Sequence, residues 1–201
     1  MKNPIINNHD FKMFNELDEI VTGNFKNQKF LTKLKQIEFN ECVFNNIDFS
    51  NTNLQKSEFI DCIFNNCDLS NSKLDNSILV RVEINDSNLT GIDFSSSSLK
   101  EVRFRDLKMN LCNFSNSVFN NCYFNNNKID DSYFNEVKFK KTIFNECTLI
   151  RTEFYKTSLN NIDFSTSNID NIKYYLTDLK GLSVNTYQAF DLSKALGIKV
   201  K

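Results

Sequence analysis

The sequence has little glycine, proline or histidine and no tryptophan. Its 201 residues include 4 Gly, 1 Pro and 1 His. Four glycines leave no glycine-rich phosphate-binding loop. The single histidine, His9, lies near the N-terminus, so the nucleophile and base pairs of many enzymes have almost no support here. We therefore expect no catalytic site, no metal and no cofactor.

The sequence also lacks a charge excess and a long apolar run. Lys+Arg number 24 against 25 Asp+Glu, a formal net charge of −1, so composition indicates no general nucleic-acid binder. No stretch of eighteen apolar residues occurs, and residues 1–21 lack the apolar region of a signal peptide. We expect a cytoplasmic interaction protein with no membrane segment, no direct nucleic-acid binding and no small-molecule substrate.

What the sequence does have is a strict period of five. From Phe39 to Val184, every residue whose number ends in 4 or 9 is apolar, thirty positions in all, and these include fifteen of the twenty Phe. Five matches neither the helical period of 3.6 nor the strand period of 2. The chain must therefore turn once in each group of five residues.

The position two residues before each apolar centre is small or aliphatic, and the other three positions are mostly polar. Four such units, turning about 90° each, would close a coil of twenty residues. Stacking the coils at the ~4.8 Å spacing of strands would pair their backbone groups. The pattern predicts an all-β solenoid in which each coil contacts only its neighbours.

Three segments resemble the motif of the pentapeptide-repeat proteins, which is small, Asp or Asn, Leu or Phe, polar, polar. They are Ile47-Asp48-Phe49-Ser50-Asn51, Cys67-Asp68-Leu69-Ser70-Asn71 and Ile162-Asp163-Phe164-Ser165-Thr166. The resemblance implies a right-handed quadrilateral parallel β-helix with short N- and C-terminal helices.

We expect three segments. Residues 1–31 form an N-terminal extension with a capping helix over residues 10–21, for which Gly23 is the stop. Residues 32–186 form the solenoid, which begins with one irregular turn. Residues 187–201 form a C-terminal helix and dimerisation module, with the helix over 186–196 and Gly197 as its stop.

All six cysteines occupy the small inward position of the repeat, where they would act as buried, unpaired apolar residues. Metal ligation is the weaker alternative, because the only histidine lies outside the repeats. Reduced thiols fit a reducing compartment. The cysteines are Cys42, Cys62, Cys67, Cys112, Cys122 and Cys147.

The scarcity of glycine also bears on the corners, because some turn types need positive φ. Asn and Asp tolerate that conformation best after glycine. They are most frequent at the corners that follow Phe44 and Phe49 and their equivalents, so we expect glycine-like type II corners, with a left-handed residue, to concentrate there. Amides one coil apart would form a hydrogen-bonded ladder through Asn45, Asn65 and Asn85, then Asn125 and Asn145.

Two groups of outward residues are candidates for a partner surface. The first is acidic and would bind a cation or a basic partner, although a solvated patch is the simpler interpretation. The second is apolar where polar residues are the rule. The acidic candidates are Glu38, Glu41, Glu58, Asp61 and Asp86; the apolar candidates are Val43, Ile63, Tyr123 and Ile143.

The C-terminal segment predicts a homodimer, because the last coil would expose an edge and more apolar surface than one short helix covers. Tyr187-Gln188-Ala189 and Leu196-Gly197-Ile198 resemble the C-terminal signature of the quinolone-resistance subfamily, whose members dimerise there and engage DNA gyrase or topoisomerase IV as DNA mimics. The predicted dimer interface comprises Tyr174, Tyr175, Leu176, Tyr187, Phe190, Leu196 and Ile198.

Charge favours a different function. Residues 32–186 contain 17 basic and 20 acidic side chains, a net of −3, whereas duplex DNA carries one negative charge per ~1.7 Å. The alternative to a topoisomerase-binding DNA mimic is a rigid scaffold that binds another protein.

Overall fold

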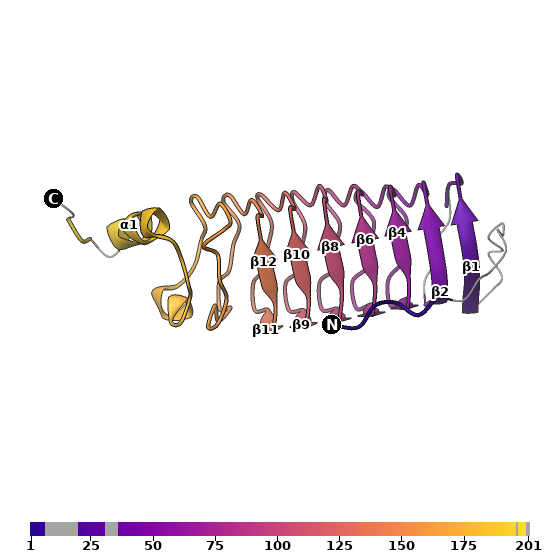
Figure 1. Cartoon of the computed structure of the whole chain (residues 1–201), viewed down its shortest axis with the longest axis horizontal. Coiled ribbons are helices and arrows are strands. Elements are labelled where there is room, and N and C mark those ends of the chain that lie inside the picture. The colour runs from indigo at the N-terminus through magenta and orange to yellow at the C-terminus, as the bar shows by residue number, and fades with distance from the viewer. Residues whose placement is uncertain (7–19, 31–35, 196, 200–201) are drawn as a thin grey trace.

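The computed structural model describes residues 1–6, 20–30, 36–195 and 197–199. In Figure 1 the strands of successive coils stand side by side along one rod, with helix α1 at its C-terminal end. The expected parallel β-solenoid is confirmed. Its elements are β1 Ile20–Lys26, β2 Glu38–Asn45, β3 Glu58–Ile60, β4 Ile63–Asn65, β5 Ile78–Val80, β6 Glu83–Asn85, β7 Ser98–Lys100, β8 Arg103–Arg105, β9 Val118–Asn120, β10 Tyr123–Asn125, β11 Lys138–Lys140, β12 Ile143–Asn145, the 3₁₀ helix η1 Leu176–Leu179 and α1 Thr186–Ala195.

Residues twenty apart pair in parallel, so the rod has four faces, each named here by its first regular centre. Face A, at Phe39, carries β3, β5, β7, β9 and β11, and face B, at Phe44, carries β4, β6, β8, β10 and β12. Strand β2 spans both faces. Faces C and D, at Phe49 and Leu54, consist of single bridges in each coil rather than strands.

The apolar centres fill the interior as four columns. The phenyl rings of Phe104 and Phe124 stack with centroids 4.6 Å apart, and those of Phe124 and Phe144 do the same. All the centres from Phe39 to Ile169 are buried except Phe139, which is half-buried. The expected interior is therefore confirmed, and burying a large apolar side chain contributes about 1.5–3 kcal/mol.

Corners on all four faces contain left-handed residues, so the prediction that these would concentrate on two faces is wrong. Positive φ occurs even at residues poorly suited to it, such as Lys56 (58°), Arg81 (53°) and Leu111 (60°). The corners differ instead in their hydrogen bonds. Turns of the kind that joins Thr52 N to Phe49 O (3.0 Å) recur after faces C and D along the rod, and they also follow faces A and B in the C-terminal coils, as from Ile162 N to Leu159 O (3.0 Å).

The solenoid begins earlier than the sequence pattern suggests. Strand β1 pairs with β2, and Phe25 and Phe30 stack on Phe44 and Phe49 at 5.4 and 4.5 Å. The helix predicted over residues 10–21 lies outside the described residues except at its end, where residues 20–21 are strand, and Gly23 lies within β1 rather than stopping a helix. The repeat shifts phase here because one coil is shorter: Phe25 pairs with Phe44, nineteen residues away.

The C-terminal helix forms as predicted over the residues that the structure describes. Gln188 fastens α1 to the last coil by donating its side-chain amide to the carbonyl oxygens of Phe164 (3.0 Å) and Ser167 (2.6 Å). Asn185 and Gln188 also cap each other's backbone. The backbone N–H of Gln188 donates to Asn185 Oδ1 at 3.0 Å, and the backbone N–H of Asn185 donates to Gln188 Oε1 at 2.9 Å. No residue of α1 is buried, so the helix covers the end of the rod without completing its core.

Candidate functional site

The six cysteines are buried free thiols, as the repeat predicts. Burial raises the pKa of Cys67 to about 11 and that of Cys122 to about 12, so the reactive thiolate is suppressed at neutral pH. Each of these thiols also donates to a backbone carbonyl of the preceding coil, with Cys122 Sγ 3.4 Å from Leu99 O. Within the described part of the chain, no three His, Cys, Asp or Glu side chains are grouped so as to hold a metal ion.

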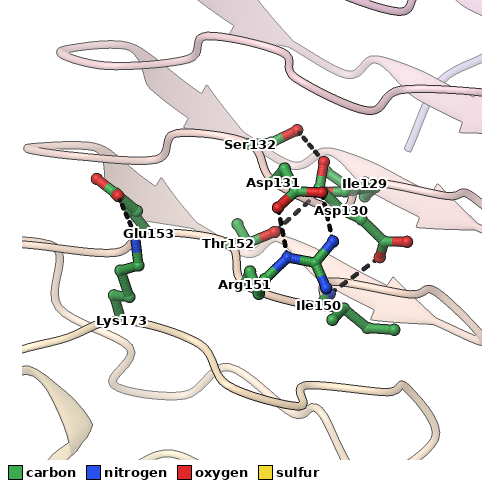
Figure 2. Close-up of polar contacts among 9 residues, drawn as sticks. All are labelled: Ile129, Asp130, Asp131, Ser132, Ile150, Arg151, Thr152, Glu153 and Lys173. Carbon is green, nitrogen blue, oxygen red and sulfur yellow. Dashed lines mark hydrogen bonds and ion pairs between the residues drawn. The ribbon is translucent and has the colours of Figure 1, made fainter.

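Most of the close ion pairs on the rod join residues one coil apart. Figure 2 shows two of them: Arg151 binds Asp131 through two contacts of 2.6 Å each, and Lys173 binds Glu153 at 2.8 Å. Hydrogen bonds from Arg151 lower the pKa of Asp131. Such pairs join coils whose register is set by backbone pairing, and they neutralise carboxylates that would otherwise contribute to a negative field.

The predicted acidic cluster divides in two. Glu38 and Glu58 are neighbours on face A, as expected. Asp61, in contrast, is only 5% exposed and is held by Arg81, whose Nε and Nη2 donate to its carboxylate at 2.6 and 2.5 Å. Burial raises the pKa of Asp61, but the hydrogen bonds from Arg81 and the Ile5 amide outweigh this, so the pKa is lowered overall. Asp61 is therefore a structural anchor and offers no free carboxylate to a partner.

The N-terminal segment, residues 1–6, explains this burial. It runs along the corner between faces A and B, with the amide of Ile5 donating to Asp61 (2.9 Å) and that of Lys2 to Glu101 (3.4 Å). Those carboxylates lie two coils apart, roughly 10 Å at the strand spacing, which an extended chain of three residues spans. Figure 1 shows the segment along one edge of the rod. No pattern in the sequence indicates this contact.

The predicted apolar surface on face B consists of two separate pairs. Val43 lies beside Ile63, and Tyr123 lies beside Ile143, which is 56% exposed. Between them, the Glu83–Arg103 ion pair (2.5 Å) occupies the same column. The amide ladder beside this column is confirmed, because Asn65 and Asn85 each donate to the preceding Asn at 3.1 Å, and Asn145 donates to Asn125 at 2.8 Å. Arg105 interrupts it.

Asp86 lies at the corner between faces B and C, away from the other acidic candidates. Asp106 and Glu146 follow it in the same corner column. None of the three makes an ion pair within the described residues, although Asp106 accepts from the side-chain amide of Asn126 at 2.6 Å. This column, Asp86–Asp106–Glu146, is thus a row of three carboxylates without an ion pair in the part of the chain that the structure describes.

The predicted dimer residues gather at the C-terminal end. Tyr187 is 85% exposed, Tyr174 is half-buried against the core, and Leu196 lies outside the described residues. A cavity of about 560 Å³ opens between the last coil and α1, and its lining includes Tyr174, Gln188 and Leu192. The remaining predicted residues are exposed: Tyr175, Leu176, Phe190 and Ile198.

Coils stacked by parallel pairing of residues twenty apart, with their apolar centres inside, define a protein built from five-residue repeats. The chain belongs to the pentapeptide-repeat family. The family model described as "Pentapeptide repeat region" matches residues 57–134. The family model described as "Pentapeptide repeats (8 copies)" matches residues 32–71 and 132–171. Neither match indicates a catalytic family. The comparison with curated proteins finds no match.

Solved structures of similar proteins include a trypsin-treated variant of QnrB1, a plasmid-mediated fluoroquinolone resistance protein. It is 20% identical, with 95% of each chain covered and a TM-score of 0.49. Another is HetL from the cyanobacterium Nostoc sp. strain PCC 7120, a pentapeptide repeat protein involved in heterocyst differentiation regulation. It is 11% identical, with 83% of this chain and 86% of that chain covered and a TM-score of 0.27.

No helix within the described residues combines the length and apolar character needed to cross a membrane.

Proposed function

We propose that this protein is a non-catalytic binding scaffold that acts as a homodimer joined through its C-terminal module. The supporting observation is where apolar surface is exposed. Of the 12 large hydrophobic residues exposed in the described chain, five fall in the last 27 residues. They are Tyr175, Leu176, Tyr187, Phe190 and Ile198.

The end of the solenoid supports the same proposal. A β-helix that simply stops leaves a coil edge that invites pairing with other chains, and solenoids are usually closed by a polar cap. Here the cap, α1, has no buried residue and leaves a cavity of about 560 Å³ beneath it. A second copy would cover both the exposed aromatic side chains and the cavity.

The test is sedimentation equilibrium of the intact protein and of a Tyr187→Ser/Phe190→Ser variant at micromolar concentration. The intact protein should be a dimer and the variant a monomer. Leu111→Ser, at a corner where Leu111 is 56% exposed, removes apolar surface of the same kind elsewhere and should leave the dimer intact. A monomeric intact protein would refute the dimer.

Binding to a type II topoisomerase is a second candidate, which the column Asp86–Asp106–Glu146 favours, together with the C-terminal sequence signature. The column spans three coil steps, roughly 14 Å. Duplex DNA carries about eight charges over that length at one per ~1.7 Å, so the column has roughly a third of the density. We therefore expect binding that is weaker than that of DNA and less steeply dependent on salt.

A gyrase supercoiling assay with and without a fluoroquinolone, repeated across a salt series, tests this candidate. Neutralising the column by Asp86→Asn, Asp106→Asn and Glu146→Gln should weaken inhibition or protection. The matched control removes three ion-paired carboxylates, with the same change in net charge, by Asp131→Asn, Glu136→Gln and Glu153→Gln. If no complex forms at tens of micromolar, topoisomerase binding is refuted and only the scaffold proposal remains.

The six buried thiols support a reducing compartment, and we propose the cytoplasm.

A further inference from the structure

Face A presents one straight outward column along the rod. It is formed by the residue that precedes each buried centre, and parallel pairing sets each member beside the next, one coil away. After Glu38, the column reads Glu58, Ile78, Ser98, Val118 and Lys138. In chemical terms the order is acid, branched apolar, hydroxyl, branched apolar, base. The apolar residues are therefore symmetric about Ser98, and the two ends carry opposite charges.

The members of this column are available for contact. Ile78 and Val118 are 39% and 40% exposed, even with the N-terminal segment in place along the neighbouring corner. Ser98 and Lys138 are exposed, and Glu58 is half-buried. In the described chain, Glu58 and Lys138 make no ion pair, unlike the paired charges of face D. Both charges can therefore be matched by a second molecule.

We propose that face A is a self-association surface on which a second copy of this chain docks antiparallel. The two-fold axis would lie midway between the two faces, parallel to strand β7 and at the level of Ser98. This operation reverses the rod direction, so that Glu58 of each copy faces Lys138 of the other, Ile78 faces Val118, and Ser98 faces itself. Such an isologous contact forms every favourable pair twice. The two sheets would pack at the usual spacing of about 10 Å.

The neighbouring residues of β7 are compatible with this arrangement. Lys100 would lie near Lys100 of the second copy, which alone is unfavourable. Glu101 follows it at the corner, however, so each lysine can pair with the other copy's glutamate. Val80, half-buried on the adjoining strand, adds apolar area beside Ile78.

The proposed contact is small. From Glu58 to Lys138 is four coil steps, roughly 19 Å, so the buried area falls at the low end for specific interfaces, below about 1,200 Å². We expect weak, concentration-dependent association in the range of tens to hundreds of micromolar. It should also weaken with added salt, because the charge pairs lie at its exposed ends.

A charge-swap cycle tests the geometry. The background is the Tyr187→Ser/Phe190→Ser variant, so that C-terminal dimerisation does not contribute and the two proposals succeed or fail separately. In sedimentation velocity up to several hundred micromolar, Glu58→Lys and Lys138→Glu should each weaken association at least tenfold. The double swap should restore it to within about threefold. Asp170→Lys, an exposed position on face C at the opposite side of the rod, makes the same charge change as Glu58→Lys and should change nothing.

A background variant that stays monomeric throughout overturns the proposal, and so do single swaps that leave association unchanged or a double swap that fails to restore it. Crosslinking checks the axis without changing any charge. Ser98→Cys with a short bis-maleimide should give covalent dimers, whereas Ser158→Cys, in the same column but three coils away, should not. The native cysteines are buried and do not interfere. Equal crosslinking at both positions would contradict the two-fold axis.

Discussion

Replacing Phe104 by Ala tests the interior columns at the middle of the rod. The Phe104 side chain is fully buried, stacks on Phe124 at 4.6 Å with ring planes 9° apart, and contacts Phe94 edge-on at 6.5 Å. Its strand neighbour on the other side is Ile84. The substitution therefore opens a cavity within a closed column. The neighbouring side chains cannot fill this cavity without giving up their own packing contacts.

Truncating a buried Phe costs about 3–5 kcal/mol of unfolding free energy. For a chain of this length, that lowers the melting temperature by roughly 6–20 °C. Because each coil contacts only its neighbours, weakening a central coil should also uncouple the two halves and broaden the urea transition.

Circular dichroism during thermal and urea unfolding provides the measurement. Ile143→Ala is the matched control, since it truncates a large residue of the same face that points outward and is 56% exposed. Its cost should stay within about 0.5–1 kcal/mol. If the two variants melt within about 2 °C of each other, against the shift expected for a lost core side chain, our assignment of inward and outward positions is refuted.

Three further outcomes are expected. Leu111→Asn should raise the unfolding free energy by about 0.5–1 kcal/mol in urea titrations, because Leu111 holds a φ of 60° that Asn tolerates better; a loss of stability would count against corner strain. Since folding lowers the pKa of Asp61, its contribution to stability is present above the ordinary value of 3.8 and should be lost as the pH falls below that value through the lowered pKa, releasing the Ile5 amide in NMR spectra, whereas Asp61→Asn should abolish that dependence. Finally, because burial raises the pKa of Cys122 to about 12, maleimide should label the native thiols slowly at pH 8 and all six at once in denaturant; rapid native labelling would contradict their burial.

The sequence predicted the features that repeat and missed those that depend on one place in the chain. The period of five identified the interior columns, the buried thiols and the side-chain hydrogen bond from Asn65 to Asn45, because each follows from repeat position alone. The nineteen-residue spacing from Phe25 to Phe44 puts Phe25 out of phase with the main register, so the pairing of β1 with β2 does not follow from the period of five.

The corners and ion pairs show the same limit. Residues such as Arg81 adopt positive φ because stacking the coils determines the backbone, which overrides local preference. The pairing of Arg81 with Asp61 could have been found by looking for opposite charges twenty positions apart. The docking of residues 1–6 could not, because it depends on single backbone amides that carry no sequence pattern.

The central claim, a dimer of rods joined at their C-terminal ends, is tested most directly by small-angle X-ray scattering on the intact protein at about ten micromolar, below the range expected for face A contacts. We predict the mass of a dimer with the cross-section of a single rod. A monomer mass, or a dimer with the cross-section of two rods side by side, would contradict it.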